Sequence, residues 1–104
     1  MRKAIVYVHN NRAGELIEEE LGHYTFKYDP DYNLEPVSLT MPVHQKVYSF
    51  NHFPPFFEGL LPEGIMLEGL LKINKFDKKD YLSQLIATGN DLVGAVTVKA
   101  DSHE

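Results

Sequence analysis

The hydrophobic pattern of this chain changes its period near the midpoint. In the first half, residues 4–8 form a short apolar run rich in β-branched side chains, which is typical of a buried strand. The two asparagines at 10–11 favour a hairpin turn into a second strand over residues 13–19, because asparagine tolerates positive φ. In residues 23–28 every second side chain is aromatic, which predicts a third strand with one aromatic face.

Apolar side chains in the second half instead recur at the period of an α-helix. The longest stripe predicts a helix that begins near the prolines at 54–55 and contributes its apolar face to the core. This stripe consists of Phe53, Phe56, Phe57, Leu60 and Leu61. Residues 65–75 and 81–86 show two further helical patterns, and Asp77 and Gly89 are the expected N-cap and end of the last helix.

The order of these segments determines the expected fold class. Residues 93–98 predict a final strand, which must rejoin the N-terminal sheet or leave its apolar side chains exposed. Strands, then helices, then one strand indicate an α+β domain with a small, mainly antiparallel sheet and about three helices packed on it. Residues 29–50 are expected to be extended and irregular, with Leu39 and Met41 on one face and packed in the core.

Composition limits the classes of function. The 104 residues suit a single domain, 1–104, with a polar tail from about residue 100. Ten Lys and Arg residues against fifteen Asp and Glu residues give a net charge of −5, which disfavours direct binding to nucleic acid. Cysteine is absent, which excludes thiol catalysis and cysteine-based zinc sites. The N-terminal apolar run is too short for a signal peptide or a membrane span, so we expect a cytoplasmic protein that makes no membrane contact.

Motifs for catalysis and for cofactor binding are missing. The seven glycines form neither a G-x-G-x-x-G pattern nor a P-loop, so no phosphate cradle is expected. The five histidines lack the spacing of a metal site, and no serine lies in a nucleophile elbow. We therefore expect no catalytic residue, no metal and no cofactor. A small enzyme that uses surface carboxylates or histidines is the alternative from another functional class.

Two segments are candidates for contact with a partner. The first is the break between two predicted helices, where an apolar pair follows a Pro-x-Gly sequence; it comprises Pro62, Glu63, Gly64, Ile65 and Met66. The pair is either tucked inward or offered to a partner, and the residues alone favour neither. The second is the lysine cluster Lys72, Lys75 and Lys79, which is either a solvated helix face or a docking patch for an acidic partner.

Three short motifs occur in a fixed order. They lie at residues 35–42 (E-P-V-S-L-T-M-P), 56–64 (F-F-E-G-L-L-P-E-G) and 89–96 (G-N-D-L-V-G-A-V). Together they resemble the N-terminal subdomain of HipA-type toxin kinases, over residues 4 to about 99. Those kinases continue into a catalytic core, whose catalytic, metal-binding and nucleotide-binding motifs this sequence lacks.

A free-standing version of this subdomain is similar to the HipS-like antitoxins of tripartite HipBST toxin–antitoxin systems. The resemblance implies that the protein binds and inhibits a HipT-like serine/threonine kinase toxin by contacting its active-site region. It also implies a ternary complex in which a HipB-like helix-turn-helix protein contacts DNA, and it favours residues 62–66 as the kinase contact. The alternative within the family is a detached N-terminal subunit of a split HipA-type kinase, with a role in assembly.

Overall fold

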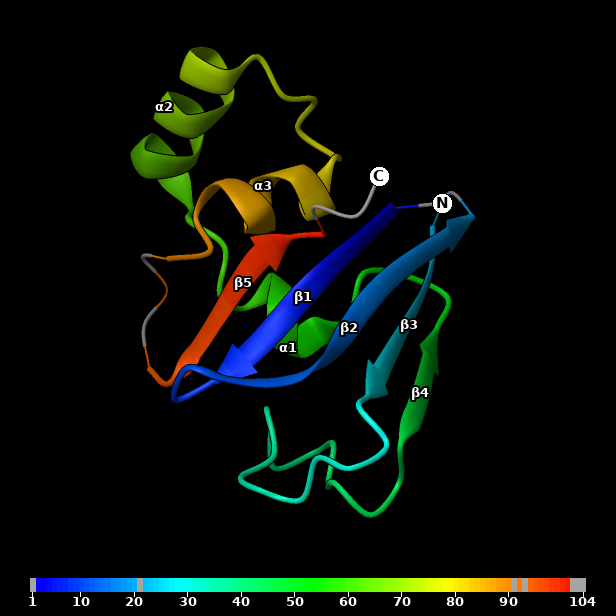
Figure 1. The fold of residues 1–104 in the computed structure, drawn as a ribbon. Helices are drawn as coiled ribbons and strands as arrows, with labels where there is room; N and C mark the ends of the chain where they lie inside the picture. The colour runs from blue at the N-terminus through cyan, green and yellow to red at the C-terminus, as the bar shows by residue number, and fades with distance from the viewer. Residues whose placement is uncertain (1, 21, 91, 93, 102–104) are drawn as a thin grey trace.

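Five antiparallel strands form one sheet in the computed structural model, with the strand order β4-β3-β2-β1-β5 (Figure 1). The structure describes residues 2–20, 22–90, 92 and 94–101, with the side chain of Ile65 outside this description. The elements are β1 (Arg2–Val8), β2 (Asn11–Glu20), β3 (His23–Tyr28), β4 (Val47–Phe50), α1 (Pro55–Glu58), α2 (Gly64–Asn74), α3 (Tyr81–Ala87) and β5 (Val96–Ala100). The predicted α+β fold is confirmed, including the C-terminal strand, which rejoins the sheet beside β1.

The first hairpin turn lies one residue earlier than the sequence predicts. His9 and Asn10 have φ values of 50° and 68°, and Asn11 already pairs with Val8 at the start of β2. Two consecutive residues with positive φ are typical of the tight turns that match the twist of antiparallel strands. The amide of His9 donates to the carbonyl of Ala95 at 2.9 Å, so the same turn also holds the chain that leads into β5.

The hydrophobic core lies between one face of the sheet and the helices α1 and α3. Alternate residues of each strand point to this face, as the register of Ala4 with Leu16 and of Leu16 with Phe26 shows. The largest fully buried apolar side chains of this core are Phe26, Phe57, Leu16, Leu82, Leu85, Val6 and Val98. Sheet and helices therefore share one core, as the sequence pattern predicts.

The aromatic stripe packs as predicted, but the helix that carries part of it is short. Helix α1 has four residues and ends at Glu58, with Gly59 as its C-cap, and Phe53 lies before it. Phe53 and Phe57 are buried, while Phe56, Leu60 and Leu61 are half-buried against the core. Two hydrogen bonds of the i→i+3 type, from the amides of Leu60 and Leu61, tighten the chain after the helix. The side chains thus keep their inward face although the regular helix has ended.

The segment between β3 and α1 differs from the sequence prediction in two ways. Residues 47–50 form the edge strand β4 instead of irregular chain. Leu39 and Met41 do not share a face: Met41 is 3% exposed and Leu39 is 95% exposed. The reason is a turn, since the amide of Met41 bonds to the carbonyl of Ser38 at 3.0 Å and replaces the strand period assumed from the sequence.

The N-cap of α3 is Asp80, and the prediction of Asp77 is wrong. Asp80 accepts a hydrogen bond from the amide of Ser83, as is typical of an aspartate at an N-cap. Asp77 lies three residues earlier and accepts from the amide of Lys79 at 2.8 Å.

The predicted final strand begins at Val93, which lies outside the described residues, and the observed strand β5 begins at Val96. No helix among the described residues is long and apolar enough to cross a membrane.

Candidate partner-binding surface

The break between α1 and α2 is a turn at the surface, and it is followed by an exposed apolar side chain. Glu63 is extended and exposed, and Gly64 opens α2 at φ 61°, a conformation that favours glycine. Pro62 is half-buried, and Met66 is 76% exposed. The side chain of Ile65, the central residue of the predicted contact, lies outside the described part of the structure. Met66 is therefore on the surface, one of the two placements that the sequence left open for the apolar pair.

Helix α2 is apolar in sequence yet contributes nothing to the main core. None of its described side chains is buried, and Met66 and Ile73 are the most exposed, Ile73 at 81%. Leu67, Leu70 and Leu71 are only half-buried. In Figure 1 the helix projects from one end of the molecule, away from the sheet. A helix with this composition normally buries its apolar stripe, whereas α2 leaves apolar side chains exposed to solvent.

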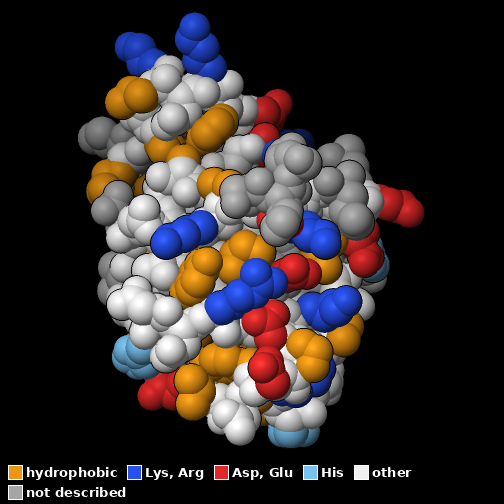
Figure 2. Space-filling model, viewed as in Figure 1, with side chains coloured by type: hydrophobic (Ala, Val, Ile, Leu, Met, Phe, Trp, Pro, Cys, Tyr) orange, Lys and Arg blue, Asp and Glu red, His pale blue; other side chains and the backbone are white. Residues whose placement is uncertain are grey.

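The three predicted lysines are all exposed, but they do not form one patch. Lys72 lies in the last turn of α2, and Lys75 follows the helix in the left-handed conformation with φ 58°. Figure 2 shows lysine and hydrophobic side chains together over α2, at the top of the view. Positive charge at this end complements the helix dipole. Lys79 instead lines a separate hollow beside Asp80, so only two of the three lysines accompany α2.

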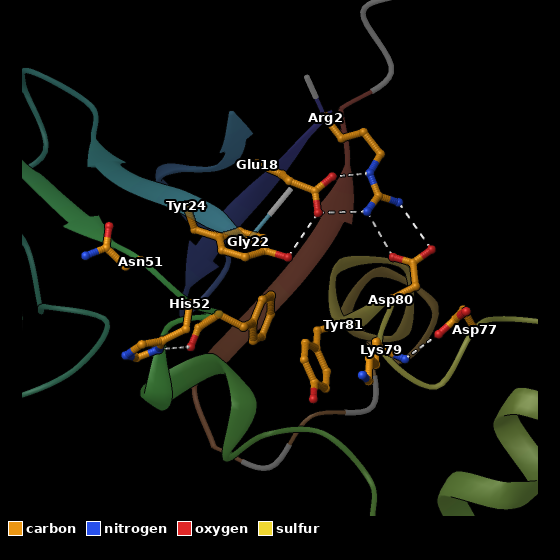
Figure 3. Close-up of a pocket in the computed structure, with 11 residues that line it drawn as sticks. Arg2, Glu18, Gly22, Tyr24, Asn51, His52, Asp77, Lys79, Asp80 and Tyr81 are labelled. Carbon is orange, nitrogen blue, oxygen red and sulfur yellow. Dashed lines mark hydrogen bonds and ion pairs between the residues drawn. The ribbon is translucent and has the colours of Figure 1, made fainter. Parts of the chain in front are cut away.

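That hollow has a volume of about 610 Å³ and contains the main charged network of the described residues (Figure 3). Arg2 on β1 bonds to both carboxylate oxygens of Glu18 on β2, at 2.7 and 3.0 Å. The same guanidinium reaches Asp80 at 2.9 Å, and Tyr24 donates its hydroxyl to Glu18 at 3.0 Å. The network thus ties three strands, β1, β2 and β3, to the start of α3. No sequence pattern predicts this network, because its partners are far apart in the chain and follow no local spacing.

Hydrogen bonding sets the protonation of this network. The bonds from Arg2 lower the pKa of Glu18 below its ordinary value. Burial alone would raise the pKa of Asp80, but hydrogen bonds from Arg2 and Ser83 lower it. Burial, together with the bond to Glu18, raises the pKa of Tyr24 to about 12. Glu18 and Asp80 therefore stay ionised and Tyr24 stays protonated at neutral pH, so the opposite charges of the network persist and stabilise the fold.

The described residues contain no group of three or more His, Asp or Glu side chains that could hold a metal ion. Two histidines lie beside carboxylates, His9 with Glu35 at 3.1 Å and His23 with Glu19 at 3.5 Å. All four side chains are exposed to a third or more, and neither pair is shielded from water. The geometry of these pairs therefore favours surface ion pairs over acid–base chemistry.

Comparison with known proteins identifies the family. A family model described as the HipA N-terminal domain matches residues 4–99. An uncharacterized protein of Haemophilus influenzae is 29% identical over 101 residues, which are 97% of this chain and 94% of that protein. A solved structure named N-terminal domain of HipA toxin is similar with a TM-score of 0.77 and 26% identity, covering 100% of this chain and 96% of that chain. These findings confirm the resemblance carried by the three motifs, and the chain belongs to the HipA N-terminal domain family.

Proposed function

We propose that this protein is a HipS-like antitoxin that binds and inhibits a HipT-like serine/threonine kinase toxin. Membership of the HipA N-terminal domain family supports a role related to toxin–antitoxin systems. The observation that carries the proposal is the match to a protein of Haemophilus influenzae: 94% of that relative is covered, so the relative consists almost entirely of a region similar to this chain. A relative of that size needs a function that does not depend on a covalently attached kinase core.

The proposed contact with the kinase is the segment Pro62, Glu63, Gly64, Ile65 and Met66. A cleft that holds nucleotide phosphates is electropositive, and Glu63 presents an exposed negative charge three residues before the exposed side chain of Met66. Interface residues at the centre of a contact typically contribute 2 kcal/mol or more, which is about thirtyfold in affinity. Lys72, Lys75 and Lys79 are secondary candidates; Lys72 lies in the last turn of α2 and Lys75 follows the helix.

The proposal includes no catalytic activity and no cofactor. We further propose that the protein acts in the cytoplasm as a single domain, within a ternary complex that contains a HipB-like helix-turn-helix protein. With a net charge of −5 the chain is poorly suited to bind DNA, so HipB would supply that contact. A gel shift with the isolated chain near physiological salt should show no specific duplex binding, and nanomolar binding would contradict this division of roles.

Substitutions in the turn test the proposed contact. The double variant Glu63→Ala and Met66→Ala should lose about thirtyfold in affinity for the kinase and should fail to restore growth to cells expressing it. Its thermal melt should change little, because both side chains are exposed. The matched control is Ile73→Ala, an exposed apolar side chain about 10 Å further along α2. Equal loss in the control would assign the contact to the helix face, and wild-type affinity in the double variant would exclude the turn.

A second candidate function follows from the name of the solved relative, which is a domain of a toxin. A detached N-terminal subunit would help a split kinase to assemble instead of inhibiting it. Co-expression separates the two functions: an antitoxin restores growth when it is supplied with the kinase, whereas an assembly subunit leaves toxicity unchanged or increases it.

A further inference from the structure

Leu39 is the most exposed of the large hydrophobic side chains that the structure describes, at 95%. It lies at the tip of the turn between Ser38 and Met41, inside the first of the three sequence motifs. A single exposed leucine on a mobile loop needs no explanation. A leucine that a fixed turn holds in solvent beside an apolar groove is less common, and Leu39 is such a residue.

Hydrogen bonds and burial fix the turn on both sides of Leu39. The hydroxyl of Tyr28 accepts from the amide of Val37 at 3.0 Å and donates to the carbonyl of Met41. Val37 and Met41 are both buried, at 5% and 3% exposure. The hydroxyl of Ser38 closes the tip through bonds to Thr40. Leu39 is thus held outward by a preorganised frame, which reduces the entropy lost when a partner covers it.

An apolar groove of about 300 Å³ adjoins this turn. Its lining contains no charged side chain and includes Met41, Tyr48, Phe50, Pro54 and Phe56. The neighbouring turn is also uncharged, since no charged residue occurs from Pro36 to Val43. A projecting leucine beside an uncharged groove can be matched by an apolar surface, whereas a nucleic acid or a charged peptide would find no partner for its charges here.

We propose that Leu39 and the adjoining groove form a second docking surface for the kinase, separate from the turn at residues 62–66. Leu39 enters an apolar pocket of the kinase, and the groove receives an apolar side chain in return. This inference rests on the proposed function, because it takes the same kinase as the partner.

The choice of partner has two supports. The solved relative is the N-terminal domain of a toxin, so in that protein the domain adjoins further polypeptide, which can cover an uncharged face of this kind. The second support is position: Figure 1 shows the segment between β3 and β4 at the opposite end of the molecule from α2. The longest extent of the chain is 39 Å, which is short enough for one partner domain to contact both ends. Contact at two ends also fixes the orientation in which the turn at residues 62–66 meets the cleft.

Affinity measurements on Leu39→Ala and Leu39→Asp test the inference. Both variants should keep the wild-type melting temperature, because the side chain contributes almost nothing to the core. Binding to a HipT-like kinase, measured by titration calorimetry, should weaken about tenfold or more for alanine and further for aspartate. The matched control is Leu34→Ala, an exposed leucine of the same segment. Its sequence neighbours do not line the groove, whereas Thr40 and Met41 beside Leu39 do, so the affinity of this control should be unchanged.

Each outcome of these measurements has one meaning. Wild-type affinity in both Leu39 variants, with binding by the wild-type chain intact, would overturn this inference and leave the proposed function standing. A wild-type chain that binds no HipT-like kinase would overturn both. A second copy of this chain is the alternative occupant of the groove, and sedimentation of the free chain tests it. If the wild-type chain is a dimer and Leu39→Asp is a monomer, a second copy covers the groove and the kinase assignment is wrong.

Discussion

Replacement of Asp80 by alanine tests the observed start of α3 against the start that the sequence suggests. Asp80 accepts from the amide of Ser83 at 3.3 Å and from its hydroxyl at 2.8 Å, and it also pairs with Arg2 at 2.9 Å. Alanine removes all three interactions and leaves the first turn of the helix without a capping side chain. Asp77, the N-cap expected from the sequence, takes no part in these contacts.

The expected loss of stability can be assembled from two contributions. An N-cap is worth about 1 kcal/mol, within a range of about 0.5–2. The side chain of Asp80 is 27% exposed and the side chain of Arg2 is 45% exposed, so the ion pair adds only about 0.2–1 kcal/mol. The free energy of unfolding should therefore fall by about 1–3 kcal/mol. For a domain of this size the melting temperature should drop by about 4–8 °C for each kcal/mol.

Thermal and urea melts followed by circular dichroism measure this loss, and Asp77→Ala is the matched control. That side chain is exposed and accepts one amide hydrogen bond, from Lys79, so its removal should cost less than about 0.5 kcal/mol. A loss in Asp77→Ala as large as that in Asp80→Ala would refute the assignment of the cap. Equal stability of Asp80→Ala and wild type would refute the role of the whole network.

Three further changes test the core, one close backbone approach and the charged network. Phe57→Ala opens a cavity under the sheet and should cost about 3–5 kcal/mol, so its melting temperature should fall by at least ~12 °C; a smaller fall would mean that the site collapses. A methyl group at Gly89 would lie 1.8 Å from a carbonyl oxygen of β5, so Gly89→Ala should lower the free energy of unfolding by about 1–3 kcal/mol in urea melts. Unchanged stability of this variant would contradict the close contact between Gly89 and β5. The pKa values of Glu18 and Asp80 in the folded protein lie below their ordinary values of 4.5 and 3.8. The ionised carboxylates therefore stabilise the fold at any pH above the ordinary values, and this contribution is lost as the pH falls through the lowered pKa values. Melts from pH 7 to pH 3 should show this loss, and Arg2→Ala should reduce it; an identical acid profile in that variant would contradict the pairing.

The strands could be predicted from the sequence because their signal is local. Residues 23–28 alternate between aromatic and polar side chains, and β3 occupies the same six residues in the structure. Strand β4 escaped prediction because four residues give too short a pattern, and its pairing with β3 depends on the path of the preceding loop. The N-cap of α3 was misplaced by three residues because two aspartates precede the helix and either side chain could accept the amide bonds.

The candidate surfaces depended on information that the sequence does not carry. Alternation along an extended strand would bury both Leu39 and Met41, but the turn at Ser38 reverses one of them into solvent. The apolar stripe of α2 is visible in the sequence, yet only the tertiary arrangement shows that this helix stands outside the main core. The network around Arg2 joins residues 16 and 78 positions apart, a separation at which no spacing rule applies.

The most direct test of the proposed function is a titration of the purified chain into an autophosphorylation assay of a HipT-like kinase. Inhibition by an antitoxin should be saturable, and phosphate incorporation should fall to the background level near an equimolar ratio at concentrations above the dissociation constant. The Glu63→Ala and Met66→Ala double variant should shift the inhibition curve by about thirtyfold, while Ile73→Ala should inhibit like wild type. Kinase activity that stays constant or rises in the presence of excess wild-type chain would contradict the role of antitoxin.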